Sequence, residues 1–429
     1  MHRSFCELEC VNLLYFTTAY ESGIFGNRVH EEFLGRMLEA GHQATVLVPD
    51  SRSRGSLQPH TEPGPPPVVR VPVSADRPAR AANLLARRTL HYDHFLTALR
   101  AYRNYLRSQP AIDIVHVESV YPLGAVAALA GDPRPFIPTI RGGDLIADDS
   151  IAYGFARFRS VRFLLRRCFA RAALVRAVSP GARDMAIAYG CPPEKIVVVA
   201  RNIRDDCFVE DVAAFRIASR RAIEARHQVA GRTLIVAAGR LLPVKGFDDL
   251  IRALPALRLH VPDATVLICG PNRDDPLLGD YAAYLRRLAA EHGVAEHISL
   301  VGHVAPEQMA EYLAAADAVA VPSLIEGGNK ILVEGAALGT PFVATSTSGT
   351  IGFFDATRDL SVPPRAPAEL AAALGTILGD KEAWRARSAA CIAGRDTFRS
   401  THVAREMQAM YRQAIAAQPA QPAVARGSQ

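Results

Sequence analysis

The sequence predicts an α/β protein with two doubly wound domains, each a parallel sheet covered by helices on both faces, that face each other across a cleft. Short apolar runs rich in β-branched residues alternate with helical patterns along most of the chain. The alternation is interrupted near residue 205 and resumes after residue 230. The length of 429 residues allows two domains that each bury a core. Strands that alternate with helices imply parallel sheets, which bind ligands at the carboxyl ends of their strands.

The first half begins with a strand, a helix and a second strand. A helical pattern covers residues 29–42, and Gly41 is the expected helix stop. Residues 51–82 are rich in Pro, Gly and Arg and are interpreted as a long surface excursion. The strands predicted in this half lie at 11–18, 44–50, 113–118, 136–140, 173–179 and 195–200.

The second half repeats the pattern after a polar, Arg-rich helix at residues 211–229. Residues 396–417 are expected to form a C-terminal helix that could pack back towards the first domain, and residues 418–429 a disordered tail. The domains themselves are placed at 1–205 and 206–395. Strands of the second domain are predicted at 233–240, 264–270, 298–302, 318–323 and 341–346.

Composition excludes several classes of protein. The formal charge of +6 suits nucleic acid, anionic lipid or a phosphorylated ligand, but an aromatic content of 7% and the lack of a basic-aromatic pattern speak against nucleic acid. The seven cysteines are scattered, which suggests neither a zinc site nor a disulfide framework. The chain has no long uncharged apolar run and no signal-peptide pattern, so a cytoplasmic location is expected.

Several nucleotide-binding signatures are missing from the sequence. It contains no G-x-G-x-x-G after a strand, no G-x-x-x-x-G-K-[ST] and no strict D-x-D pair for a metal-bound diphosphate. No metal is therefore predicted. An anionic ligand in the cleft would have to be neutralised by protein groups.

The segment GRLLPVKGF (239–247) offers two such groups. Arg240 and Lys245 follow a predicted strand and are separated by a turn that contains Pro243 and Gly246. A guanidinium supplies forked donors and an ammonium a compact charge, a pair suited to a diphosphate. A solvated Arg and Lys at a strand end is the alternative.

The segment SLIEGGNK (323–330) leads from a strand into a predicted helix. The glycines let a ligand approach the first N–H groups of that helix, whose partial positive end favours phosphate. Glu326 lies at the helix mouth, and Glu334 lies about 12 Å further along at about 1.5 Å per residue. Two carboxylates at that spacing can hold opposite ends of an elongated ligand; a plain helix-capping charge is the alternative for Glu326.

These segments resemble the retaining nucleotide-sugar glycosyltransferases of GT-B fold, classed as family four. Glu326 and Glu334 form the E-x7-E element in PSLIEGGNKILVEGAALGTPFVAT, and GRLLPVKGF is similar to the phosphate-binding segment. The resemblance implies two Rossmann-like domains, the first binding the acceptor and the second the nucleotide-sugar donor. Further similar segments lie at 21–49, 139–144, 177–203 and 301–323, so the resemblance covers most of the chain.

The resemblance implies a role for each matched residue. Arg240 and Lys245 would neutralise the donor diphosphate, and Glu326 would hold sugar hydroxyls near the reacting carbon; these three are the expected catalytic residues. Glu334 would bind the ribose hydroxyls. The other expected donor-binding residues are Gly23, Gly270, His303, Val304, Gly327, Gly328, Asn329 and Lys330.

The chain departs from the family pattern at three places. Many relatives carry a histidine where this chain has TIRGGD, so Arg141 stands at or near that position, and an arginine cannot act as a base. The motif PNG is replaced by RNI and EGFG by EGGN, which leaves the donor sugar open. The candidates for acceptor binding are His116, Glu118, Arg141 and Asp144.

The resemblance implies a metal-independent transferase without a cofactor. It would move a sugar from a nucleoside diphosphate, with UDP-sugars such as UDP-GlcNAc or UDP-glucose favoured, to a hydroxyl of a small-molecule or glycan acceptor. A donor phosphate oxygen would accept the proton of that hydroxyl. A monomer or a homodimer is expected.

Two other functions remain open. A catalytically inactive nucleotide-sugar-binding protein would keep the same cleft. A membrane-surface enzyme acting on a lipid-linked acceptor is suggested by residues 157–176 (RFRSVRFLLRRCFARAALVR), which have seven arginines, no acid, and Phe and Leu at helical spacing. A core helix with a solvated basic face is the favoured interpretation of that segment.

Overall fold

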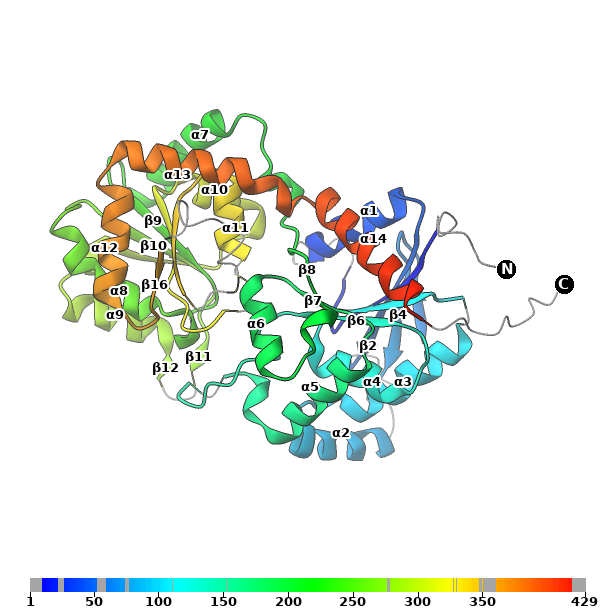
Figure 1. Ribbon diagram of the computed structural model, residues 1–429. Coiled ribbons are helices and arrows are strands. Elements are labelled where there is room, and N and C mark those ends of the chain that lie inside the picture. Colours follow the sequence, from blue (N-terminus) through cyan, green and yellow to red (C-terminus); the bar gives the residue numbers. More distant parts are fainter. Residues whose placement is uncertain are drawn as a thin grey trace.

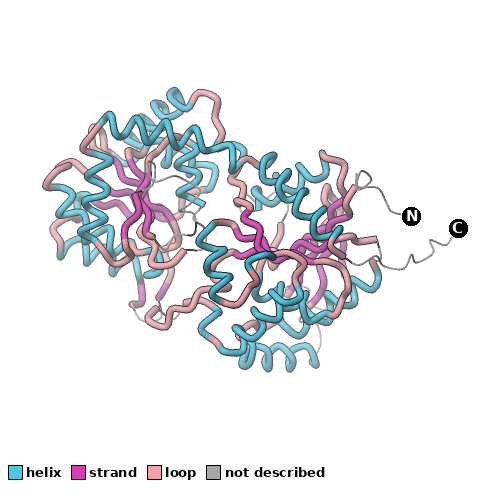
Figure 2. The backbone as a smooth tube through the Cα atoms, in the orientation of Figure 1, coloured by secondary structure: helices cyan, strands magenta, loops and turns pink. Residues whose placement is uncertain are grey.

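The structure, a computed structural model, consists of two α/β lobes that lie side by side (Figure 1). In Figure 2 the strands form two separate groups, each wrapped by helices, which confirms the predicted fold class. We call the lobe with the eight-stranded sheet the first lobe and the lobe with the six-stranded sheet the second lobe. The structure describes residues 10–21, 27–51, 59–73, 77–109, 111–151, 153–275, 278–326, 328, 330–346, 349 and 360–418.

The sheet of the first lobe has the strand order β3-β4-β2-β1-β5-β6-β7-β8. All neighbours pair in parallel except β3 and β4. The carboxyl ends of the parallel strands therefore meet at one edge. The strands are β1 (Asn12–Phe16), β2 (Gln43–Asp50), β3 (His60–Glu62), β4 (Val68–Pro72), β5 (Ile114–Val117), β6 (Phe136–Ile140), β7 (Val175–Ala177) and β8 (Ile196–Val198).

The prediction of a surface excursion at residues 51–82 is wrong for the part that forms β3 and β4. Val68, Val69 and Val71 are buried, and β4 pairs in parallel with β2 over five residues. The valine-rich pattern outweighs the neighbouring prolines because Pro72 stands at the strand end, where a missing N–H is tolerated. Residues 52–58 and 74–76 of this segment lie outside the described residues.

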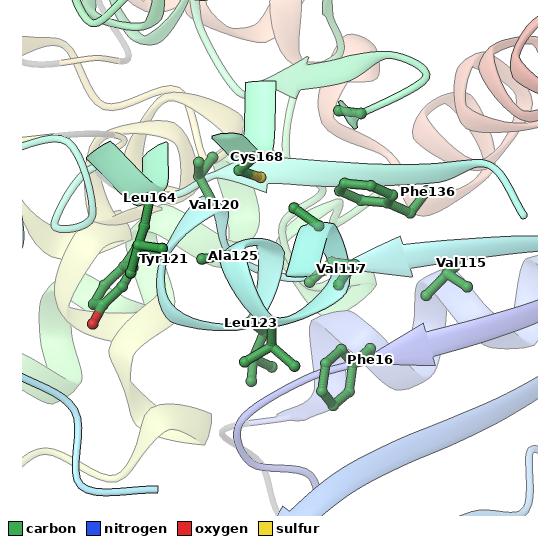
Figure 3. Packing of buried hydrophobic residues seen from close by; sticks show 14 of the residues in the cluster. Phe16, Val115, Val117, Val120, Tyr121, Leu123, Ala125, Phe136, Leu164 and Cys168 are labelled. Carbon is green, nitrogen blue, oxygen red and sulfur yellow. The ribbon is translucent and has the colours of Figure 1, made fainter. Parts of the chain in front are cut away.

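Helices cover both faces of the first sheet. On one face, β1, β5 and β6 bury side chains such as Phe16, Val117 and Phe136 against Leu123 and Cys168 (Figure 3). The other face is covered by α1 and by the last helix of the chain. The helices of this lobe are α1 (Arg28–Glu39), α2 (Arg77–Leu90), α3 (Phe95–Ser108), a π-helical turn η2 (Val120–Gly124), α4 (Ala125–Ala130), α5 (Arg159–Arg171) and α6 (Pro180–Ala188).

The second lobe has an all-parallel sheet with the order β13-β10-β9-β14-β15-β16. Its strands are β9 (Leu234–Ala238), β10 (Thr265–Cys269), β13 (Ile298–Gly302), β14 (Ala318–Val321), β15 (Phe342–Thr345) and β16 (Leu360–Val362), beside a small pair, β11 (Asp274–Asp275) and β12 (Gly279–Asp280). Its helices are α7 (Val212–His227), α8 (Phe247–Arg258), α9 (Tyr281–Glu291), α10 (Pro306–Ala315), α11 (Lys330–Ala337), α12 (Pro367–Leu378) and α13 (Lys381–Gly394).

The last helix, α14 (Ser400–Ala416), lies against the first lobe although it follows the second lobe in the chain (Figure 1). Val403, Met407 and Tyr411 are buried in the same cluster as the apolar residues of β1, β2 and α1. The first lobe is therefore built from two separate segments of the chain.

The basic segment at 157–176 forms α5, whose apolar residues pack into the core of the first lobe. Val161, Leu165 and Phe169 are fully buried, whereas the side chain of Phe163 is 57% exposed among the arginines. Among the described residues, none of the helices combines the length and the apolar character needed to cross a membrane.

Candidate active site

Glycines let the loops after β9, β10 and β14 approach one another closely. A Cβ at Gly270, which follows β10, would lie 1.8 Å from the Gly239 carbonyl oxygen. Gly246 has a left-handed φ of +64°, and a Cβ there would lie 2.0 Å from the Pro322 carbonyl oxygen. Only glycine fits these positions. The loops after β9, β10 and β14 therefore form one compact surface beside the start of α11, which we call the floor of the site.

Lys245 and Glu326 meet on this floor. Lys245 ends a short 3-10 turn, η6 (Pro243–Lys245), and its Nζ donates to Glu326 Oε2 at 2.6 Å. Ser323 Oγ donates to the same oxygen at 3.3 Å. The two charged side chains remain 19% and 15% exposed, so neither is fully enclosed by the protein. The structure thus brings together two of the three predicted catalytic residues.

Arg240 occupies a different place. It is exposed and lines an open hollow whose other wall is formed by first-lobe residues, including Arg87, Tyr153 and Phe155. No hydrogen bond or ion pair joins Arg240 to Lys245 or Glu326 within the described part of the chain. The joint action of Arg240 and Lys245 on one diphosphate stays a prediction from the sequence.

Glu334 lies in the second turn of α11, with its side chain only 1% exposed. Its Oε1 lies 3.4 Å from Lys330 Nζ and 3.9 Å from a guanidinium nitrogen of Arg204, but it accepts no hydrogen bond among the described residues. Arg204 also pairs with Asp206 and donates to the Pro306 carbonyl. The sequence did not indicate Arg204 as a site residue. It lies in the linker between the lobes, far from Glu334 in the chain, and the two residues come close only in the folded structure.

The remaining predicted donor residues are spread around this floor. Gly328 lies beside the first lobe, since a Cβ there would meet Val178 at 3.3 Å. His303 is exposed and Val304 is buried in the loop after β13, whose Gly302 carbonyl accepts from Gly270 N at 2.7 Å. The predicted donor residues Gly23, Gly327 and Asn329 lie outside the described residues.

A cavity opens between the two lobes next to Gly328 and Lys330. The second lobe contributes the start of α11, and the first lobe contributes the ends of β5 to β8 and the segment that follows them. The carboxyl ends of the first-lobe strands thus face the amino end of a second-lobe helix, which is favourable for an anionic ligand. The cavity is lined by Glu118, Thr139, Arg141, Arg176, Val178, Arg201, Asn202, Ile203, Gly328, Lys330, Val333 and Phe398.

Glu118 lines this cavity, and His116 lies behind it. The His116 ring is fully buried, with Nε2 3.2 Å from Glu118 Oε1 and Nδ1 2.5 Å from Tyr411 Oη. Burial alone would raise the pKa of Glu118, but the hydrogen bond with His116 and the charge of Arg141 hold it well below its usual range. Of these two acceptor candidates, only Glu118 can contact a ligand in this cavity.

The other two acceptor candidates, Arg141 and Asp144, also differ in whether they line the cavity. Arg141 lines the cavity, is 35% exposed, and has a guanidinium nitrogen 3.8 Å from Glu118 Oε2. Asp144 is buried and accepts from the Val120 backbone N–H at 2.8 Å, at the start of η2. Burial raises the pKa of Asp144 in spite of this hydrogen bond. The structure therefore gives Asp144 a helix-capping contact.

Two family models match the chain and together extend over most of it. The model described as glycosyl transferase 4-like domain matches residues 26–202, and the model described as glycosyl transferases group 1 matches residues 219–391. The first match covers most of the first lobe. The second match covers most of the second lobe, including the loops that contain Lys245 and Glu326.

The chain is similar to several curated proteins. A D-inositol 3-phosphate glycosyltransferase from Jonesia denitrificans is 32% identical over 56% of each chain. One of the same description from Mycolicibacterium vanbaalenii is 30% identical over 71% of this chain and 67% of that relative. A GDP-mannose-dependent α-(1-6)-phosphatidylinositol monomannoside mannosyltransferase from Mycobacterium tuberculosis is 27% identical over 74% of this chain and 76% of that relative.

Solved structures share the fold. A sucrose-phosphate synthase from Thermosynechococcus elongatus has a TM-score of 0.71 at 18% identity, covering 95% of this chain and all of that one. The Anabaena protein HepE in complex with UDP has a TM-score of 0.67 at 16% identity, covering 93% and 99%. At these identities the likeness concerns the fold alone.

Proposed function

The chain is a glycosyltransferase of GT-B fold and belongs to family four, and we propose that it transfers a sugar from a nucleoside diphosphate to an acceptor hydroxyl with retention of configuration. The observation that carries this proposal is the Lys245–Glu326 pair, 2.6 Å apart and half-buried beside the start of α11. A cation, a carboxylate and a helix amino end at one point can serve the phosphate and the sugar of one ligand.

In the proposed reaction the bond from the anomeric carbon to the donor phosphate breaks, and a bond to the acceptor oxygen forms on the same face. A phosphate oxygen of the donor takes the acceptor's proton. Lys245 and the amino end of α11 stabilise the negative charge of the leaving nucleoside diphosphate, so no metal is required. Glu326 leaves Lys245 to bind sugar hydroxyls, and Glu334 binds the ribose through Oε1, which accepts no hydrogen bond from the described residues.

Substitution of the central pair tests the proposal. Lys245→Ala and Glu326→Ala are expected to lower transfer, or slow donor hydrolysis, about a hundred- to a thousandfold, because each removes a group that acts on the reacting centre. Lys381→Ala, which removes an exposed lysine from α13, is the control. Near-normal turnover in both site variants would refute the assignment. Tight nucleotide binding by the wild type without any turnover would favour an inactive binding protein instead.

The nucleotide is the first unknown to determine. Relatives at 27% identity are named for GDP-mannose, whereas HepE was solved with UDP, so a UDP-sugar and a GDP-sugar are both candidate donors. Calorimetric titration of UDP, GDP and ADP, with and without EDTA, gives the base preference and the metal requirement together. We expect UDP or GDP to bind at least about tenfold more tightly than ADP, a difference of about 1.4 kcal/mol.

A second candidate function is the same transfer at a membrane surface. The observation that favours it is the outer face of α2 and α5, where Leu84, Leu85 and Phe163 are more than half exposed. Both helices carry several arginines and no acidic residue. Binding to vesicles with anionic lipid, weakened by salt and by Phe163→Ser, would support membrane contact. Failure to sediment with either neutral or anionic vesicles would remove this candidate, while the cytoplasmic location stays a prediction from the sequence.

A further inference from the structure

Three arginines form one wall of the cavity between the lobes. Arg141 follows β6, Arg176 lies within β7, and Arg201 follows β8. These strands are neighbours in the first sheet, so their carboxyl ends bring the three guanidinium groups to one place. The three residues are far apart in the chain, and no sequence motif links them.

The positive charge of this wall is only partly balanced. Glu118 is the one carboxylate among the described residues that line the cavity. No carboxylate of the described chain lies within 4.0 Å of Arg176 or Arg201, and Arg141 has Glu118 at 3.8 Å. His30, which contacts Arg201, is neutral because burial lowers its pKa to about 3. Among the described residues that line the cavity, the three positive charges of this wall therefore share one carboxylate, Glu118, whose charge also acts on Arg201.

An excess of positive charge is unfavourable where the charged groups are partly buried. Arg176 is buried and donates to the carbonyls of Val199 and Ala200, which satisfy its hydrogen bonds without neutralising it. Burial and the nearby charge of Arg141 lower the pKa of Arg201 to about 10, so it stays protonated at neutral pH. A ligand with two negative charges would relieve this repulsion, and forked guanidinium donors match the oxygens of a phosphate or a carboxylate.

We propose that this cavity binds an anionic group of the acceptor, a phosphate or a carboxylate, through Arg141 and Arg201. The inference rests on the proposed function and refines it, since it assigns the acceptor to phosphorylated or carboxylated sugars and alcohols. The second-lobe side of the cavity, with Gly328 and Lys330 at the start of α11, belongs to the proposed donor site, whose diphosphate also has Lys245 as a cation. The three arginines belong to the opposite lobe, next to Glu118, which is available to orient the acceptor hydroxyl.

Inorganic phosphate is the probe for the anion site. It is titrated calorimetrically into the full chain, first alone and then with saturating UDP or GDP, whichever binds more tightly. We expect phosphate to bind in both cases, and Arg201→Gln and Arg141→Gln each to weaken it at least about tenfold while changing nucleotide affinity less than about threefold. Arg100→Gln, which removes an exposed arginine from α3, should change neither.

Two results would overturn the inference: phosphate that does not bind, or phosphate that competes with the nucleotide, since competition would assign the arginines to the donor. Arg141→Gln keeps the test valid if Arg201→Gln does not fold, because Arg141 lies outside the contact of Arg201 with His30. A chain that binds phosphate through these arginines but binds no nucleotide would contradict the proposed function and leave the anion site established. Transfer at least about tenfold faster to hexose phosphates than to free hexoses would assign the anion to the acceptor.

Discussion

Buried polar side chains connect the cavity to the interior of the first lobe. Arg201 contacts His30 Nε2 at 3.2 Å, and Tyr15 Oη lies 2.5 Å from His30 Nδ1. His116 makes a similar bridge between Glu118 and Tyr411 of α14. Polar groups in a low-dielectric interior stabilise a single arrangement only while each keeps its partner. Protonation of either histidine would disturb this network.

His30 makes stability depend on pH in the acid range. Burial lowers the pKa of His30 from 6.5 to about 3, so its contribution to stability is fully present above pH 6.5 and is lost as the pH falls towards 3. At pH 5 the loss should be about 2 kcal/mol, and the buried His116, whose pKa burial also lowers, acts in the same direction. Urea unfolding at pH 7.5 and pH 5.0 measures the difference.

The matched variants for this experiment are His30→Gln and His60→Gln. His30→Gln should be less stable at pH 7.5 but lose less stability between the two pH values than the wild type does. His60 is exposed on β3, so its replacement should leave the pH dependence unchanged. If His30→Gln and the wild type lost the same free energy of unfolding, His30 would not be the group that titrates.

The sequence alone could identify only part of the site. Glu326 and Lys245 were found because each stands in a local segment with glycines and a strand before it, and the structure places them in contact. Arg176, Arg201 and Arg204 could not be found in this way. Their neighbours depend on the order of β6, β7 and β8 and on the path of the linker, which no local pattern encodes.

At the scale of elements, the turn η6 fixes the position of Lys245. Leu324 N donates to the Val244 carbonyl at 2.9 Å, and Gly246 follows with its left-handed φ against Pro322. The turn and the loop that carries Glu326 are therefore held together through the backbone. The geometry of the charged pair depends on this contact as well as on the side chains themselves.

Gly246→Ala should disturb the site without removing any charged group. Its Cβ would lie 2.0 Å from the Pro322 oxygen, so the turn must move and carry Lys245 with it. We expect nucleotide affinity to fall at least about tenfold and stability to fall by about 2 to 4 kcal/mol. Gly293→Ala is the control, because Gly293 has a similar φ of +66° but open space around it. If both variants lost only about 1 kcal/mol and bound nucleotide normally, the close contact at Pro322 would not position Lys245.

The strands show what the sequence can and cannot predict at this scale. Runs such as 136–140 and 298–302 agree with β6 and β13 residue for residue, because short apolar runs that contain β-branched residues are typical of strands. In contrast, β4 and β16 were missed. Prolines flank β4, and β16 has only three residues, so neither has a clear local strand pattern. Each is defined mainly by its pairing with a neighbour, β4 with β2 and β16 with β15.

At the scale of the whole molecule, α14 brings a late segment of the chain back onto the first lobe. Its apolar face packs on the strands and on α1 of the first lobe, and the hydrogen bond from Arg36 of α1 to Ser400 of α14 joins residues 364 positions apart in the sequence. The first lobe is therefore not complete without residues that follow the second lobe. Its stability should respond to substitutions near the C-terminus.

Met407→Ala tests this dependence. Met407 is fully buried on α14, and its truncation should destabilise the first lobe by about 2 to 5 kcal/mol. Hydrogen exchange should become faster in β1 and β2 and stay unchanged in β9 and β10. Arg405→Ala, on the exposed side of the same helix, is the control. Faster exchange in both sheets would show instead that the lobes unfold as one unit.

The position of α14 also bears on how the protein is made. Residues 12–198 leave the ribosome with one face of their sheet covered by α1 but not yet by α14, and at about 5 to 20 residues per second α14 follows about 10 to 40 s later. During that delay the second lobe can fold before α14 packs on the first lobe. The apolar surface that α14 will cover is then exposed and can bind a chaperone. Two nascent chains on one messenger could also exchange their last helices and emerge as an intertwined dimer.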